Sequence, residues 1–209
     1  MSKTDNLTLE INKTKTALII QDLQNDNISQ DGAKDVTGSV AHAKSQNVVE
    51  NVKNLAQAAR TAGIPVIHIW YIVEKNAVGL KTNAPLFQDV KESSICVRGT
   101  WGAEPAKGLE PLDSDFIVEK MRMNGFHDSR LDILLRGLEV ETLILTGAFT
   151  NFSIEHTARH GADAGYKVIV ASDGTSTLND EWQYAALNYA LTQIAQVANC
   201  DEIAKAIAF

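Results

Sequence analysis

The sequence contains little of what marks several classes of protein. Its two cysteines, Cys96 and Cys200, are too few and too isolated for a disulfide framework or a thiolate metal site. No apolar run approaches the roughly 18 residues that a membrane-spanning helix needs. The first residues, MSKTDNLTLEINKTK, are polar and contain no apolar h-region. We therefore expect no membrane segment, no secretory signal and a cytoplasmic protein.

Basic residues are also scarce relative to acidic ones. The chain has 19 Lys and Arg against 26 Asp and Glu, a formal net charge of -7. This balance argues against the basic face with which proteins bind nucleic acid or anionic membranes. The hydrophobic share of 44% is ordinary for a globular chain and excludes disorder. We predict a single domain over residues 1–209, with an N-terminal extension over about 1–14.

Short apolar runs alternate with helical stretches along most of the chain. The run TALII at 16–20 is typical of a strand buried on both faces. Apolar residues then recur at three- and four-residue steps over 47–62, which predicts a helix. Later strands are expected at 65–72, 115–118, 141–146, 167–171 and 194–198, and later helices at 129–138, 153–165, 179–191 and the C-terminus. This alternation implies parallel crossover connections, so we predict a doubly wound α/β fold.

Residues 74–112 interrupt the alternation. The segment is rich in glycine and proline and is predicted to be mostly loop, with one short strand at 94–97. A loop of this length inside a compact domain is usually a lid or a binding loop. We therefore interpret 74–112 as the lid region of a binding site.

Three residues whose side chains could take part in catalysis follow predicted strands. Asp22, Lys120 and Ser153 each lie at the end of an apolar run. Ligands of open parallel sheets bind beyond the carboxyl ends of the strands, where a partly desolvated carboxylate and ammonium would have perturbed pKa values. Taken singly, Asp22 also fits a turn aspartate, Lys120 a solvated loop lysine, and Ser153 a helix N-cap.

Cofactor and metal motifs are missing from the sequence. There is no GxGxxG after a strand and no P-loop, so we predict no organic cofactor. His156 and His160 have an i,i+4 spacing that can bind zinc, but they lack the HExxH order and an evident third ligand. We therefore predict no metal.

Three segments in order resemble the signatures of the isochorismatase-like hydrolases, also called cysteine hydrolases. They are QDLQND at 21–26, EKMRMNGF at 119–126 and TGAFTNFSIEHTA at 146–158, within a match that covers about residues 14–200. This family includes nicotinamidases, N-carbamoylsarcosine amidases and isochorismatases. The resemblance implies a six-stranded, mostly parallel sheet with helices on both faces, a small-molecule substrate, and a homo-oligomer, commonly a dimer or tetramer.

The resemblance also implies roles for individual residues. Asp22 matches the aspartate that acts as general base or acid, and Lys120 matches the lysine that orients the site and lowers the pKa of the nucleophile. A cis peptide bond is implied between Ala148 and Phe149. The N–H groups of Phe149 and Ser153 would then form the oxyanion hole.

Further residues are candidates for contact with the substrate. Trp101 lies in RGTWG at 98–102, which resembles the lid segment of the family. Tyr71 and Phe126 stand near strand ends, and Asn151 lies next to the implied oxyanion hole. Simple loop packing for Trp101, core packing for the two other aromatic residues, and helix capping for Asn151 are the alternatives.

Ser153 occupies the position at which amidases of the family carry the catalytic cysteine. A serine hydroxyl is far less acidic than a thiol and usually needs a stronger relay. The serine is compatible with a replaced cysteine in an otherwise active amidase, with a native branch that hydrolyses a vinyl ether with Asp22 as acid, and with a crevice that only binds. We favour a native serine, because Phe149 and Asn27 also depart from the common pattern. The sequence therefore predicts a hydrolase of a small molecule, with a non-catalytic binding module as the alternative.

Overall fold

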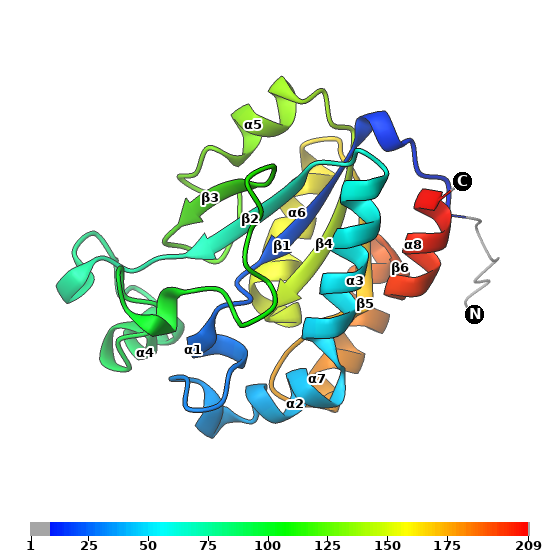
Figure 1. Cartoon of the computed structure of the whole chain (residues 1–209). Helices are drawn as coiled ribbons and strands as arrows, with labels where there is room; N and C mark the ends of the chain where they lie inside the picture. The colour runs from blue at the N-terminus through cyan, green and yellow to red at the C-terminus, as the bar shows by residue number, and fades with distance from the viewer. Residues whose placement is uncertain (1–8, 209) are drawn as a thin grey trace.

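The computed structural model describes residues 9–208 and contains one sheet of six parallel strands in the order β3-β2-β1-β4-β5-β6 (Figure 1). Residues 1–8 of the predicted N-terminal extension lie outside the described residues. The sheet confirms the predicted doubly wound α/β fold. Its strands are β1 (Thr16–Gln21), β2 (Val66–Tyr71), β3 (Phe116–Lys120), β4 (Thr142–Ala148), β5 (Lys167–Ser176) and β6 (Gln196–Ala198).

The central strand β1 is buried along its whole length, because β2 and β4 flank it and both faces are covered. Leu18 and Ile20 pack into the core on one face, and Ala17 and Ile19 pack into the core on the other. From β1 the chain builds the sheet in one direction, and from β4 it builds in the other. The topological switch point, where such sheets bind ligands, therefore lies between β1 and β4.

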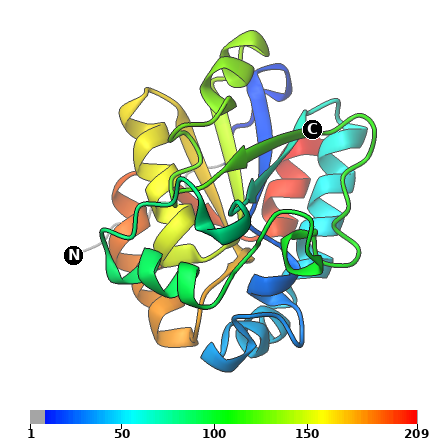
Figure 2. The same ribbon diagram turned by 90° about the vertical axis from the view of Figure 1, so that its left-hand side faces the viewer.

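Helices cover both faces of the sheet, as predicted. Figure 2 shows α3 (cyan) and α6 (yellow) on opposite sides of the strands. Within residues 9–208, no helix has the length and the hydropathy that crossing a bilayer requires. The main covering helices are α3 (Val48–Thr61) and α8 (Cys200–Ala208) on one face, and α5 (Leu131–Gly137) and α6 (Glu155–Asp163) on the other.

The predicted loop over 74–112 contains a helix, α4 (Pro85–Glu92), that the sequence analysis did not predict. Proline at the first helical position starts it, and Phe87 and Val90 bury one side. The short strand predicted at 94–97 is wrong, because only an isolated bridge between Val73 and Val97 forms there. The high density of glycine and proline predicted a loop, but the segment contains a helix of two turns that is stabilised by packing rather than by its own helix propensity.

The other connections contain short helices. Between β1 and α3 lie α1 (Asn25–Ile28) and α2 (Ser39–Ser45), neither of which was predicted. The helix predicted over 179–191 is interrupted: it begins as α7 (Asp180–Ala185) and continues as π-helical turns at Ala186–Ala190 and a 3-10 turn at Leu191–Gln193. Another π-helical turn, Thr150–Ile154, joins β4 to α6.

Candidate active site

Asp22 and Lys120 form a buried ion pair at the carboxyl edge of the sheet. Asp22 follows β1, and Lys120 is the last residue of β3, two strands away. The Lys120 Nζ donates to Asp22 Oδ2 at 2.7 Å and also to the carbonyl of Arg122 at 3.0 Å. The side chains of Lys120 and Asp22 are 0% and 4% exposed. The lysine spans β2 on the way and lies 4.8 Å from the centroid of the Tyr71 ring.

Asp22 is held in an uncommon backbone conformation. Its φ of 58° lies in the left-handed region, which aspartate tolerates better than most residues. The Asp22 N–H donates to the Ile69 carbonyl at 2.9 Å, and the Asn27 side chain donates to the Asp22 carbonyl at 2.9 Å. The carboxylate is thus fixed through its own backbone. Its second oxygen, Oδ1, is buried without a hydrogen-bond partner.

Burial sets the electrostatics of the pair. It raises the pKa of Asp22, while Lys120 and, less strongly, the hydroxyl of Ser153 oppose that rise. Burial lowers the pKa of Lys120, and Asp22 opposes that change. The pKa of the Tyr71 phenol is raised, mainly by burial, and its hydroxyl also lacks a hydrogen-bond partner. Opposed pKa shifts in neighbouring groups are typical of sites that transfer protons.

Ser153 joins this pair from the other side of the switch point. It lies in the π-helical turn after β4, is 3% exposed, and directs its hydroxyl to the sulfur of Met123 at 3.5 Å. The Ala148–Phe149 peptide bond is cis, as the resemblance implies. Just before it, a Cβ at Gly147 would lie 2.0 Å from the Gln21 carbonyl oxygen, so only glycine allows β1 and β4 to approach here.

Asp22, Tyr71 and Ser153 line one recess with a volume of about 30 Å³. Most of its wall is apolar, and its charged lining residues are Asp22 and Lys34. The recess is closed down to the size of a water molecule, so a substrate enters only when lining side chains move. Its lining residues are Asp22, Asn27, Lys34, Tyr71, Leu86, Val90, Ile95, Met123, Ala148, Phe149, Phe152 and Ser153.

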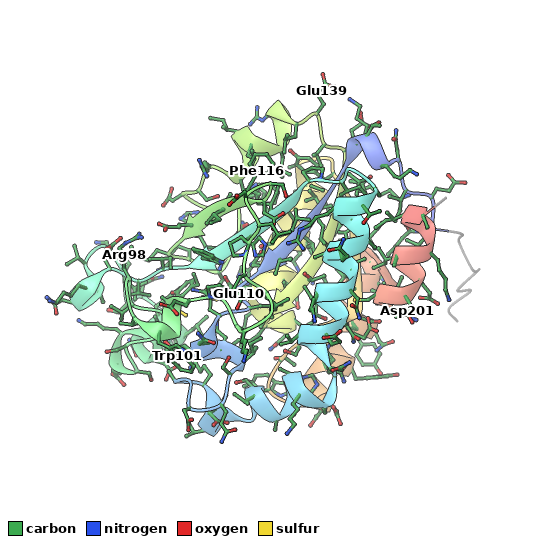
Figure 3. The ribbon with its side chains drawn as sticks, in the orientation of Figure 1. Arg98, Trp101, Glu110, Phe116, Glu139 and Asp201 are labelled. Carbon is green, nitrogen blue, oxygen red and sulfur yellow. The ribbon has the colours of Figure 1, made fainter. Side chains whose placement is uncertain are left out.

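Tyr71, Ala148 and Phe149 line the recess as the sequence analysis expects, but three other candidates do not. Phe126 stacks on His160, with ring centroids 4.5 Å apart, and belongs to the core under α6. The side chain of Asn151 accepts a hydrogen bond from the Thr177 hydroxyl. Trp101 is 50% exposed and lies in a 3-10 turn that packs on α1 (Figure 3). For these three the alternative of packing or local hydrogen bonding describes the structure better.

The sequence analysis missed several lining residues. Leu86 and Val90 come from the unpredicted α4, and their i,i+4 spacing with an apolar neighbour was the available signal. Met123 and Phe152 lie inside the recognised segments but carry no distinguishing pattern. Lys34 lies between α1 and α2, and nothing in its surroundings marks it as a pocket residue.

The segment QDLQND also anchors the lid region. The Gln24 side chain donates to the carbonyls of Tyr71 at 3.0 Å and Ala103 at 2.7 Å. The Asp26 carboxylate accepts from the Cys96 N–H at 2.7 Å. A Cβ at Gly102 would lie 2.1 Å from Asp26 Oδ2, which explains the glycine in RGTWG. The signature therefore contains Asp22 and also ties residues 96–103 to the pocket.

Two other features lie apart from this site. Among residues 9–208, no group of three or more His, Cys, Asp and Glu side chains is placed to hold a metal ion. A larger recess of about 400 Å³ lies at the opposite edge of the sheet, next to Arg60 and Asp115. There the Asp115 carboxylate is bonded by Arg60 and lies 3.3 Å from His68 Nε2, so it already has partners within the protein.

Known protein families include one that matches most of the chain. The family model described as the Isochorismatase domain matches residues 16–202. The chain belongs to the isochorismatase family of hydrolases. This membership confirms the resemblance found in the sequence.

Relatives with names and solved structures agree with this family. The chain is 33% identical to ureidoacrylate amidohydrolase RutB of Serratia proteamaculans, with 93% of the chain and 83% of the relative covered. It is 29% identical to the isochorismatase family protein YecD of Escherichia coli O157:H7, with 95% and 100% covered. A cysteine hydrolase from Pseudomonas syringae pv. phaseolicola has a TM-score of 0.85 at 27% identity, with 96% and 95% covered. Nicotinamidase PncA from Bacillus subtilis has a TM-score of 0.73 at 25% identity, with 88% and 99% covered.

Proposed function

We propose that the chain hydrolyses a C–N bond of a small amide or ureido compound in the recess between β1 and β4. The observation that carries this proposal is the state of the Asp22 carboxylate. Oδ2 is held by Lys120, whereas Oδ1 is buried and lacks a partner, and Asp22 lines the same recess as Ser153. The similarity to ureidoacrylate amidohydrolases supports a C–N bond as the target.

Each member of the site has one task in the proposed reaction. Asp22 takes the proton of the Ser153 hydroxyl as its oxygen attacks the substrate carbonyl, and then passes that proton to the leaving nitrogen. The N–H groups of Phe149 and Ser153 hold the developing oxyanion. Water, deprotonated by Asp22, then cleaves the acyl–serine ester and restores the hydroxyl. Lys120 keeps the carboxylate in place throughout.

The surroundings of Ser153 bear on how well it serves as nucleophile. Its hydroxyl is held by the sulfur of Met123, which is a weak acceptor, so turning toward Asp22 costs little. A raised pKa makes Asp22 a stronger base than an ordinary carboxylate. These two features favour activation of a hydroxyl at this position.

A second candidate is hydrolysis of a vinyl ether without a covalent intermediate. It is favoured by the serine at position 153, because this reaction needs no covalent nucleophile there. The raised pKa of Asp22 also favours its protonated form, which would protonate the vinyl carbon before water adds.

A panel of substrates separates these reactions. The purified chain is incubated with small primary amides, ureido compounds and isochorismate, and release of ammonia or pyruvate is measured. Ammonia release that falls by roughly 10²-fold or more in Asp22→Asn supports the first reaction, since proton transfer contributes about that much. Pyruvate release supports the second. No product from any substrate argues for a pocket that only binds, and a rate unchanged in Asp22→Asn would show that Asp22 does not transfer the proton.

Two further properties remain part of the proposal. We infer a homo-oligomer, dimer or tetramer, as the family resemblance implies, and a location in the cytoplasm. Sedimentation equilibrium of the full chain measures the first. A chain that sediments as a monomer at all concentrations would contradict it.

A further inference from the structure

Lys34 lines the recess, and the proposed reaction does not use it. Its side chain is only 13% exposed, and its ammonium pairs with the carboxylate of Asp89 on α4. Asp89 itself is 49% exposed and does not line the recess. The counter-ion of Lys34 thus lies on the solvent side of the ammonium.

The remaining wall offers little else for a charged ligand. The charge of Asp22 is balanced by Lys120, and the other residues that line the recess with Lys34 are mainly apolar, among them Leu86, Val90 and Ile95. An ammonium in such surroundings binds an anion more strongly than one in water, because the local dielectric constant is low.

Lys34 is also held firmly in place. Its N–H donates to the Asp26 carbonyl at 2.8 Å, and its carbonyl accepts from the hydroxyls of Thr37 at 2.6 Å and Ser39 at 2.9 Å. Asp26 in turn is bonded to the Cys96 N–H. The backbone of Lys34 is therefore fixed, through Asp26, to the lid region at Cys96. Such pre-organisation lowers the cost of binding.

We propose that Lys34 binds a carboxylate carried by the substrate, so that the pocket takes small amides or ureido compounds with an acidic end. That such compounds are hydrolysed rests on the proposed function, whereas the binding of their carboxylate by Lys34 does not. On binding, the substrate carboxylate replaces that of Asp89 at the ammonium. The exchange is inexpensive because Asp89 is half exposed and returns to water, where an ion pair contributes little.

The alternative is that the pair of Lys34 and Asp89 only ties α4 to the loop after α1. A tie and a binding site differ in what they predict for ligands. Loss of a tie weakens every ligand alike through the lid region. Loss of a carboxylate site weakens anions and spares neutral molecules of the same shape.

The test is an equilibrium titration of the full chain with acrylate and with acrylamide, which have nearly the same shape and differ in charge. Ligand NMR signals report binding without turnover, in the wild-type chain and in Lys34→Met, Lys34→Gln and Asp89→Asn. We expect either Lys34 variant to weaken acrylate by about tenfold or more, the scale of a charge-assisted hydrogen bond, and to leave acrylamide within about twofold. Asp89→Asn should tighten acrylate, because it removes the competing carboxylate.

The outcomes separate this inference from the proposed function. Equal effects on both ligands, or no binding of acrylate to the wild-type chain, would overturn the role of Lys34 even if amides are hydrolysed. Selective loss of acrylate in a chain that hydrolyses no amide would leave the carboxylate site standing and remove the proposed reaction. If Lys34→Met does not fold, Lys34→Gln and Asp89→Asn decide the matter.

Discussion

The Lys120 ammonium reaches Asp22 by passing over the ring of Tyr71. Nζ lies 2.7 Å from the carboxylate and 4.8 Å from the ring centroid. The aromatic face stabilises a cation that burial would otherwise destabilise. The Tyr71 hydroxyl contributes nothing to this contact, because it is buried and has no hydrogen-bond partner.

We therefore expect the ring and the hydroxyl of Tyr71 to have separable roles. Tyr71→Phe should not lower the free energy of unfolding, since it removes an unsatisfied polar group. It should raise KM if the hydroxyl bonds the substrate in the recess. Tyr71→Leu should destabilise by about 1–2 kcal/mol, through loss of the cation–π contact and of ring packing. Denaturant unfolding of both variants measures the difference, and equal stability of the two would contradict the role of the ring.

His68 provides a pH dependence of stability far from the site. Burial lowers its pKa from the ordinary 6.5, against the opposing effect of Asp115. The folded state therefore prefers neutral histidine, and its contribution is complete above pH 6.5 and is lost as the pH falls toward the lowered value. The slope from this group is at most about 1.4 kcal/mol per pH unit. His42, whose pKa is lowered by burial despite Asp180, acts in the same window.

The measurement is the free energy of unfolding between pH 7.5 and pH 5, expressed as its slope against pH, for the wild-type chain and for His68→Asn. The variant should be less stable at neutral pH, because it loses packing, but should have a shallower slope. The remaining slope is assigned to His42 by the double variant His42→Asn, His68→Asn. A single variant with the full wild-type slope would show that folding does not lower the pKa of His68.

Gly102 provides a test of how the lid region is anchored. A Cβ there would lie 2.1 Å from the carboxylate oxygen of Asp26, which also holds the Cys96 N–H. Gly102→Ala should therefore displace Asp26, destabilise the chain by roughly 1–3 kcal/mol and loosen residues 96–103. Gly137→Ala is the matched control, because nothing lies within 4 Å of a Cβ at that position. Hydrogen exchange of the Cys96 amide should rise in the first variant and not in the second.

The sheet was predictable because its strands are continuous apolar runs whose burial on both faces leaves a strong pattern. β1 illustrates this, with all six of its residues buried. α4 was not predictable, since its apolar side of two turns is stabilised by the lid that surrounds it. The periodicity of a segment shows which of its sides is apolar, but it does not show which residues from distant parts of the chain pack against that side.

The site shows the same division. Asp22, Lys120 and Ser153 lie at strand ends that meet, as predicted, but it was the resemblance to the family that singled them out from other residues at strand ends. Phe126 was placed in the pocket wrongly, because an aromatic residue after a strand can turn to either face, and here Met123 faces the recess while Phe126 stacks on His160. Lys34 enters the recess only through the fold of the loop after α1, which no periodicity in the sequence describes.

The last prediction concerns the nucleophile. Under the proposed C–N hydrolysis, Ser153→Cys should raise the rate on an amide by roughly 10²-fold, the scale that proton-transfer catalysis typically supplies, because a thiol is ionised far more readily beside a base and a cation. Ser153→Ala should abolish the reaction.

If the site adds water to a vinyl ether, Ser153→Cys should instead hydrolyse no amide, and Ser153→Ala should reduce pyruvate release only moderately. Alkylation checks the thiol directly: the pKa values of Cys96 and Cys200 are raised and neither residue lines the recess, so only a thiol at position 153 should react quickly. Amide hydrolysis by the cysteine variant that survives alkylation would exclude position 153 as the nucleophile.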